Sequence, residues 1–218
     1  MNIFKAYNYL IESEDTGRLK KIFARYELFK KTLLVPGDII ECGVFKGTGH
    51  IFWLKLLKIF DEHSIKKVVG FDTFANFADS ILEYEKKNAK KFTKEANYNT
   101  KISIKEINKK IKNLGLIKRS ELIKGDITKT AKKYVENNKG FKISLLSLDL
   151  DTYEGTKSSL NVFYKKISRN GIIILDEYGK RGWGETDAVD EFLENHKELE
   201  IKTIEYSNQP TAYIVKKL

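Results

Sequence analysis

The sequence predicts one α/β domain built on an open, mostly parallel sheet, with helices on both faces and an antiparallel hairpin at its C-terminal end. Short apolar stretches typical of buried strands alternate with segments of helical periodicity, which is the pattern of a parallel sheet. The last two stretches are joined by residues 207–210, a connection too short for a crossover, so these strands should be antiparallel. With 218 residues, the chain is long enough for one sizeable core and short for two full domains. We therefore expect residues 1–218 to form a single domain.

The first half of the chain starts with a helical segment, after which strands alternate with helices. Residues 1–35 are expected to be an N-terminal helical segment, because apolar residues of its second half share one helical face and Pro36-Gly37 stops it. The elements expected next are a buried strand over 38–44, a glycine turn over 43–49 leading into a helix that carries the apolar residues of 51–60, a second strand over 66–72, an irregular polar segment over 73–100, and a helix over 103–114. We expect residues 73–105 to act as a lid or insertion.

The second half repeats the alternation with clearer boundaries. The expected elements are a short strand over 120–126, a helix over 128–137, a strand over 142–149, a helix over 155–167, a strand over 171–176, a helix over 185–196, and two final strands over 200–206 and 211–217. Because crossovers between parallel strands are right-handed, the helices should cover both faces of the sheet.

Composition limits the classes of function. The net charge is +10, and residues 81–142 carry the whole excess, with 18 Lys and Arg against 7 Asp and Glu. This segment is either an interaction site for an anion such as RNA or a lysine-rich solvated face, and the lack of interleaved Arg favours the solvated face. No apolar run is long enough for a membrane helix. The single cysteine, Cys42, excludes an internal disulfide, and the N-terminus lacks signal-peptide features, so a cytoplasmic location is expected.

A glycine-rich turn follows the first expected strand. In ECGVFKGTG (residues 41–49), Gly43 and Gly47 allow a sharp turn and a close approach of the backbone to a ligand, and the helix that starts near Thr48 favours an anion at its N-terminus. The spacing is not the G-x-G-x-x-G of dinucleotide binders, so a plain tight turn is the alternative.

Three acidic positions favour the ligand-binding interpretation. Glu41 precedes the turn and can meet an amino group, while Asp72 ends the second strand, where a carboxylate can accept both hydroxyls of a ribose. S-adenosylmethionine has both groups. Asp126, after the third strand, either accepts from the adenine amino group or serves as a helix N-terminal acid. Thr48, with the neighbours Thr73 and Ile127, completes the predicted cofactor site.

Two acid pairs end the next two parallel strands. Asp149 and Asp151 follow one strand, and Asp176 with Glu177 follow the other, so all should meet at the carboxyl edge of the sheet. Carboxylates gathered in one place repel each other and persist through raised pKa values or a bound cation. Hard oxygen ligands suit Mg²⁺, which would bind and orient a substrate hydroxyl while Asp151 takes its proton. Alternatively, some of these acids cap helices or pair with Lys180 and Arg181.

Five motifs in order carry a resemblance to a known family. VPGDIIECGVFKGTG, VVGFDTF, LIKGDITKT, LSLDLDTYEGT and GIIILDEYG, the last followed by DAVDEF, resemble the macrocin O-methyltransferase (TylF) family over roughly residues 19–193. The resemblance implies a Rossmann-like class I methyltransferase fold and metal-dependent transfer of a methyl group from S-adenosylmethionine to a sugar hydroxyl. The residues it assigns are metal ligands Asp149, Asp176 and Glu177, base Asp151, and cofactor contacts Glu41, Gly43, Asp72 and Asp126.

The sequence departs from the family at Glu177, where the family usually has aspartate, and in the segment TFANFADS after Asp72. Substrate choice therefore cannot be carried over from the family. For the acceptor we expect contacts from Tyr153, Tyr178 and Trp183. For Tyr153, core packing is an equal alternative, and for Trp183, stacking on a sugar face and simple packing of its loop are equal alternatives. His50 is expected to be a packed or surface histidine.

The function predicted from the sequence is S-adenosylmethionine- and Mg²⁺-dependent O-methylation of a sugar on a glycan or glycosylated small molecule. Alternatives are methylation of a catechol or phenol, an RNA-binding methyltransferase, and a non-catalytic binding protein; the intact acid cluster argues against the last. Nucleic acid is the less favoured partner, and a homo-oligomer is left open.

Overall fold

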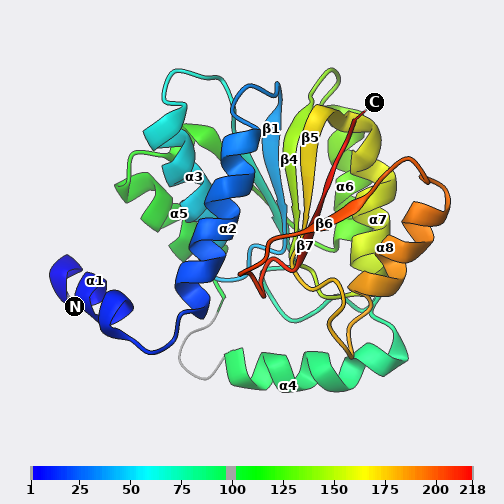
Figure 1. The fold of residues 1–218 in the computed structure, drawn as a ribbon, viewed down its shortest axis with the longest axis horizontal. Coiled ribbons are helices and arrows are strands. Elements are labelled where there is room, and N and C mark those ends of the chain that lie inside the picture. The colour runs from blue at the N-terminus through cyan, green and yellow to red at the C-terminus, as the bar shows by residue number, and fades with distance from the viewer. Residues whose placement is uncertain (1, 97–101, 218) are drawn as a thin grey trace.

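The computed structural model describes residues 2–96 and 102–217, and these form a seven-stranded sheet of order β3-β2-β1-β4-β5-β7-β6 (Figure 1). The strands are β1 (Asp38–Cys42), β2 (Val68–Asp72), β3 (Ser120–Lys124), β4 (Ile143–Leu148), β5 (Ile167–Leu175), β6 (Ile201–Thr203) and β7 (Ala212–Val215). β1 to β5 are mutually parallel, and β7 runs antiparallel between β5 and β6. The predicted α/β fold with a C-terminal antiparallel hairpin is confirmed.

The strand order places a switch point at the centre of the sheet. From β1 the chain proceeds outward through β2 to β3 and then returns to the other side of β1 with β4. β1 and β4 are buried on both faces along almost their whole length, which matches their continuous apolar sequence. Crossovers that leave in opposite directions open a crevice at the carboxyl ends of β1 and β4, where open α/β sheets bind ligands.

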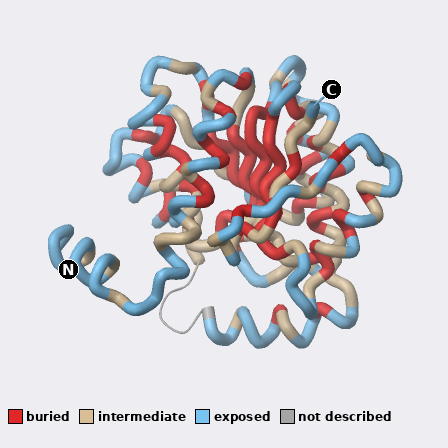
Figure 2. The backbone as a smooth tube through the Cα atoms, in the orientation of Figure 1, coloured by how far each residue is buried: buried red, intermediate tan, exposed pale blue. Residues whose placement is uncertain are grey.

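Two helical layers cover the sheet. One contains α2 (Gly17–Lys31), α3 (Thr48–Phe60) and α5 (Ile104–Asn113), and the other contains α6 (Ile127–Asn137), α7 (Tyr153–Phe163) and α8 (Glu185–Glu194) (Figure 1). Alternate strand residues face opposite layers: Ile39 packs in the cluster with α2, α3 and α5, and Ile40 in the cluster with α6, α7 and α8. The buried residues are concentrated in the strands and the helix faces against them (Figure 2). No described helix is long and apolar enough to cross a bilayer.

The segment after β2 is more ordered than the sequence indicated. Residues 73–100 were expected to be irregular, but a short 3₁₀ turn over Glu83–Glu85 leads into α4 (Lys86–Ala96), and residues 97–100 lie outside the described chain. Five lysines on α4 hid its amphipathic pattern: Ala89 is buried, and Phe92 and Thr93 face the crevice. α4 crosses below the carboxyl edge of the sheet, apart from the two helical layers (Figure 1).

The predicted N-terminal helical segment consists of two helices. α1 (Ile3–Glu12) is capped by the Asn2 side chain, which accepts from the Lys5 amide at 2.9 Å, and none of its residues is buried. After a break, α2 packs Ala24, Leu28 and Phe29 into the core. α2 therefore belongs to the body of the domain, whereas α1 stands away from it (Figures 1 and 2).

Candidate active site

A cavity of about 780 Å³ opens at the carboxyl ends of β1, β2 and β4. Its lining comes from the turn after β1, the ends of β2, β3 and β4, one side of α2, and the lid segment between β2 and α5. Of the predicted cofactor residues, the lining includes Glu41, Gly43, Thr48, Asp72, Thr73, Asp126 and Ile127 but not Gly47. Residues that are far apart in the sequence thus line one cavity, because the parallel strands that carry them end at the same edge of the sheet.

The glycine turn lies tightly against the end of β4. Gly43 has φ +94°, and a Cβ at this position would lie 1.8 Å from the backbone oxygen of Asp149. Gly47 has φ +83° and is the N-cap of α3, so the helix starts directly beside the cavity. Only glycine allows both the left-handed backbone and the close approach. The turn therefore brings the N-terminus of α3 and the acid pair of β4 together.

Glu41 is buried beneath the turn between two basic side chains. Its Oε2 lies 3.2 Å from Nδ1 of His50, whose Nε2 contacts the Ser120 hydroxyl at 2.9 Å. Gly49 leaves the room for this arrangement, because a Cβ there would lie 2.4 Å from Oε1 of Glu41 and 2.8 Å from Nη1 of Arg25. His50 is fully buried and so is the packed histidine that the sequence favoured.

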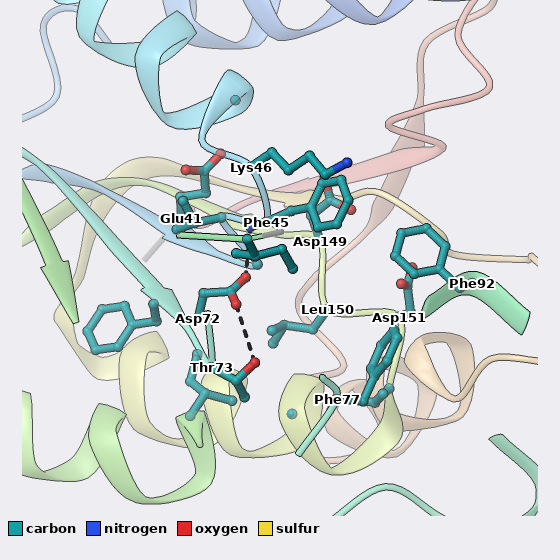
Figure 3. Close-up of a pocket in the computed structure, with 18 of the residues that line it drawn as sticks. Glu41, Phe45, Lys46, Asp72, Thr73, Phe77, Phe92, Asp149, Leu150 and Asp151 are labelled. Atoms are coloured by element: carbon teal, nitrogen blue, oxygen red, sulfur yellow. Dashed lines mark hydrogen bonds between the residues drawn. The ribbon is translucent and has the colours of Figure 1, made fainter. Parts of the chain in front are cut away.

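Asp72 fastens the turn to the lid. Its Oδ2 accepts from the Phe45 amide at 2.8 Å, and its Oδ1 accepts from the Phe74 amide at 2.7 Å and, at 3.4 Å, from the Thr73 hydroxyl (Figure 3). Phe45 and Phe74 both have positive φ, a conformation that persists where surrounding contacts hold it. Each carboxylate oxygen keeps further acceptor capacity, so Asp72 can hold the backbone and still face a ligand.

Asp126 caps α6. Its Oδ1 accepts from the Thr128 amide at 2.9 Å and from the Thr128 hydroxyl at 2.7 Å. The helix N-terminal role that the sequence left open is therefore present. Because Asp126 and Ile127 also line the cavity, contact with an adenine stays a prediction beside the cap.

Asp149 and Asp176 meet, and two cations from α2 contact both. Lys21 Nζ lies 3.3 Å from Asp149 Oδ2 and 2.8 Å from Asp176 Oδ2, and Arg25 Nη2 lies 3.0 Å from Asp149 Oδ2 and 3.5 Å from Asp176 Oδ1. Burial opposes ionisation of Asp149, but Lys21 and Arg25 hold its pKa below the usual range. For Asp176, burial and then the charge of Asp149 raise the pKa to about 6.

Lys21 and Arg25 line the candidate site and were not among the residues predicted from the sequence. Together with Arg18 they recur at three- and four-residue spacing along α2, so all three face the cavity. This spacing of basic residues, beside the apolar positions of the same helix, is the signal in the sequence that indicates them. Arg25 is buried, and its guanidinium also lies over the Trp53 ring, 5.4 Å from the centroid.

Glu177 does not join the other two predicted metal ligands. Its side chain contacts Lys180, with Nζ 2.6 Å from Oε1, and accepts from Gln209 Nε2 at 2.5 Å. The described residues contain no group of three or more His, Cys, Asp or Glu side chains arranged to hold a metal ion. The pairing with Lys180, an alternative that the sequence left open, is what is observed.

Asp151 lines the cavity with a strained backbone. It has φ +65°, and its carbonyl accepts from the amides of Gly184 at 3.1 Å and Glu185 at 3.2 Å. Burial, followed by the charges of Asp149 and Glu177, raises the pKa of Asp151 well above its ordinary value. A carboxyl group whose pKa is raised in a cavity is a candidate general base.

The three predicted acceptor contacts point elsewhere. Tyr153 hydrogen-bonds through its hydroxyl with Glu191 and Lys157, and the Tyr178 hydroxyl donates to Asp190 at 2.7 Å. Trp183 stacks on Phe77 with the ring centroids 5.6 Å apart, which is the packing alternative. None of the three lines the cavity, so their contact with an acceptor stays a prediction.

Other aromatic side chains cover the cavity instead. The Phe45 and Phe92 centroids are 5.7 Å apart, and those of Phe92 and Phe77 are 5.9 Å apart. Figure 3 shows these rings on the side of the cavity where Asp149 and Asp151 lie. The lid thus presents an apolar surface to the space beside the candidate base.

Comparisons with known proteins agree with this geometry. Residues 17–208 match the family described as macrocin-O-methyltransferase (TylF). The chain is 26% identical over 145 residues to demethyldecarbamoylnovobiocin O-methyltransferase of Streptomyces niveus, a match that covers 66% of this chain and 53% of that protein. The chain therefore spans about half the length of this curated relative.

Solved structures with the same fold cover nearly the whole chain. The O-methyltransferase NovP superposes with a TM-score of 0.76 at 22% identity, over 92% of this chain and 81% of that one. CalS11, described as a TDP-rhamnose 3'-O-methyltransferase of calicheamicin biosynthesis, superposes with a TM-score of 0.72 at 22% identity, over 99% and 87%. These likenesses show the Rossmann-like methyltransferase fold. Since the family match includes the glycine turn and both acid pairs, the chain belongs to the macrocin O-methyltransferase (TylF) family.

Proposed function

We propose that this protein is an S-adenosylmethionine-dependent O-methyltransferase that acts on a sugar hydroxyl. One observation carries the proposal: a single cavity contains the glycine turn with Glu41 and Asp72 at one end and the candidate base Asp151 at the other. The family and the relatives, whose names describe O-methyltransferases, support the activity.

The cofactor would be held by residues that the structure brings together. Gly43, in the turn after β1, and Thr48, the first residue of α3, suit its carboxylate, because free helix amides favour an anion. Glu41 suits its ammonium and Asp72 its ribose hydroxyls, and Asp126 with Ile127 suits its adenine. When bound, S-adenosylmethionine supplies an electrophilic methyl group.

The chain's own residues would prepare the acceptor. Asp151 takes the proton of the acceptor hydroxyl while the hydroxyl oxygen forms a bond to the methyl carbon. The bond between that carbon and sulfur breaks, and the sulfur leaves as a neutral thioether. The raised pKa of Asp151 makes it a stronger base than an ordinary carboxylate. The rings of Phe45, Phe77 and Phe92 give the cavity an apolar wall, which would favour displacement of water when an acceptor binds.

Mg²⁺ forms part of the proposal, and two of its three predicted ligands fit. Asp149 and Asp176 are adjacent hard oxygen donors, and the buried Oδ1 of Asp176 accepts no hydrogen bond from a described residue, its recorded partner being the Arg25 guanidinium at 3.5 Å. Glu177 would have to leave Lys180 and Gln209 to join them. When bound, the ion would lower the pKa of a coordinated hydroxyl.

A second acceptor class is favoured by one observation. Phe45, Phe77 and Phe92 line the cavity, and aromatic walls suit a catechol or phenol as well as the face of a sugar. Methyl transfer to TDP-rhamnose and p-nitrophenyl rhamnoside, compared with transfer to catechol, would separate the two classes. Turnover of catechol alone would replace the sugar proposal.

Calorimetry of S-adenosylmethionine binding tests the cofactor site before any acceptor is known. We expect micromolar binding by the parent, loss of binding in Asp72→Ala, and binding largely kept in Asp149→Ala, which should lose its heat of Mg²⁺ binding. Asp79→Ala is the matched control, because Asp79 is an exposed aspartate on the lid segment that follows Asp72. No binding by the folded parent would refute the methyltransferase proposal.

A further inference from the structure

Glu85 is a fully buried carboxyl group outside the cavity, at the start of the lid helix α4. All the hydrogen bonds recorded for its side chain come from backbone amides. Oε2 accepts from Leu82 at 2.8 Å, within its own turn. Oε1 accepts from Tyr153 at 2.8 Å and from Gly184 at 3.0 Å, two amides in other parts of the chain.

These two distant amides lie on either side of the candidate base. Tyr153 follows Asp151 by two residues and begins α7, and the Gly184 amide also donates to the Asp151 carbonyl at 3.1 Å. One oxygen of Glu85 thus contacts both segments that hold the Asp151 backbone at φ +65°. A left-handed non-glycine residue persists only where its surroundings over-determine it.

The same lid segment contacts the loop after β5 at two further points. Asn88 Nδ2 donates to the Gly182 carbonyl at 2.7 Å, and Phe77 stacks on Trp183. The loop has no spare room here: a Cβ on Gly184 would lie 2.5 Å from Glu85 Oε1, and one on Gly182 would lie 2.3 Å from Asn88 Nδ2. The two glycines therefore permit the lid and the loop to lie in contact.

We propose that Glu85 is a positioning residue that couples the lid to the start of α7 and to the loop after β5 and thereby fixes the Asp151 backbone for proton transfer. The inference rests on the proposed function, in which Asp151 is the base. Because α4 also presents Phe92 and Thr93 to the cavity, one segment both covers the acceptor and sets the geometry of the base.

The test compares Glu85→Ala and Glu85→Gln with Glu83→Ala. Glu85→Gln keeps a carbonyl oxygen that can accept from the amides of Tyr153 and Gly184, whereas Glu85→Ala removes both acceptors. Glu83 is a matched control, because it lies in the same 3₁₀ turn with an 87% exposed side chain and pairs only with Lys86 among the recorded contacts. Hydrogen exchange and methyl transfer to TDP-rhamnose and p-nitrophenyl rhamnoside are the two readouts.

In Glu85→Ala we expect faster amide exchange confined to residues 150–156 and 180–186, with the central strands unchanged. We expect kcat to fall about 100-fold, the effect of misplacing a catalytic group by about 1 Å. The Kd for S-adenosylmethionine should stay within about threefold of the parent value, since the cofactor contacts are untouched. Glu85→Gln should recover at least about tenfold in kcat, and Glu83→Ala should match the parent.

Two results would overturn the inference. One is unchanged exchange at both segments in folded Glu85→Ala. The other is a parallel loss of kcat and cofactor affinity without rescue by glutamine, which would indicate general destabilisation. If the parent neither binds S-adenosylmethionine nor methylates a probe, the proposed function is refuted instead. Amide exchange at residues 150–156 and 180–186 in Glu85→Ala then tests the structural coupling without the activity.

Discussion

Arg25 lies close to three carboxylates: Glu41 on β1, Asp149 after β4 and Asp176 after β5. Its removal therefore tests whether a cation from α2 stabilises these acids. Its side chain is 6% exposed and contacts Asp149 at 3.0 Å and Asp176 at 3.5 Å. Asp176 is fully buried and the Asp149 side chain is 27% exposed, so the energetics of a buried pair apply rather than those of a surface pair. Arg25→Met keeps most of the packing volume and removes the charge.

Breaking a buried pair from one side costs about 3–5 kcal/mol, because the remaining charge is left uncompensated. Lys21 still contacts both carboxylates in the variant, so we expect the lower end, about 3 kcal/mol. For a domain of this size, that lowers the Tm by roughly 6–12 °C. The assay is urea unfolding at pH 7, followed by two spectroscopic probes to check that the transition is two-state.

The double variant Arg25→Met/Asp149→Asn separates charge from packing. In Arg25→Met the two carboxylates share Lys21 alone, so removing the charge of one of them should restore at least about 1 kcal/mol relative to Arg25→Met, since neighbouring sites are non-additive. Arg18→Met, on the exposed part of the same helix, should stay within about 0.5 kcal/mol of the parent. If Arg25→Met is as stable as the parent, or if the double variant loses the sum of the single losses, the electrostatic reasoning is wrong.

Three other outcomes are expected. Asp151→Asn should lower kcat by about 10²- to 10⁴-fold, the usual contribution of a general base, with S-adenosylmethionine affinity unchanged in calorimetry; retention of kcat would exclude Asp151 as the base. Burial raises the pKa of the Cys42 thiol, so at pH 8 native protein should react with a disulfide reagent far more slowly than urea-unfolded protein; equal rates would contradict its burial. RNA binding should be weak and show little salt dependence in a filter assay, since we interpret the lysines of α4 and α5 as a solvated face; nanomolar binding with a steep salt slope would favour the RNA alternative.

The sequence was sufficient to predict the elements that depend on local pattern. The strands over 38–44 and 142–149 were recognisable because both are buried on two faces and read as continuous apolar runs. The glycine turn could be located because only glycine tolerates its backbone conformation, and Asp149 and Asp176 could be placed together because parallel strands end at one edge.

The directions in which the side chains near the acid cluster point could not be predicted from the sequence. Tyr153 and Tyr178 adjoin the acid cluster in the chain, but their hydroxyls reach Glu191 and Asp190 on α8, and the position of α8 is set by packing of the whole layer. Likewise, Glu177 follows Asp176 directly, but the two residues lie in a bend after the end of β5. The Asp176 carboxylate contacts Lys21 of α2, whereas the Glu177 carboxylate pairs with Lys180 and Gln209, and the sequence gives no sign of this difference.

The sequence by itself determined the alternation of strands and helices outside the segment that contains α4, the place of the glycine turn, and the edge of the sheet where the acids gather, because these follow from local periodicity and chain connectivity. Only the tertiary structure decided which cations neutralise those acids and what holds the candidate base. Lys21 and Arg25 lie more than 120 residues from Asp149, and Glu85 lies 68 residues from Tyr153. The spacing of the basic residues on α2 can indicate that they share one face, but which carboxylates they contact depends on how the helices and the lid pack against the finished sheet.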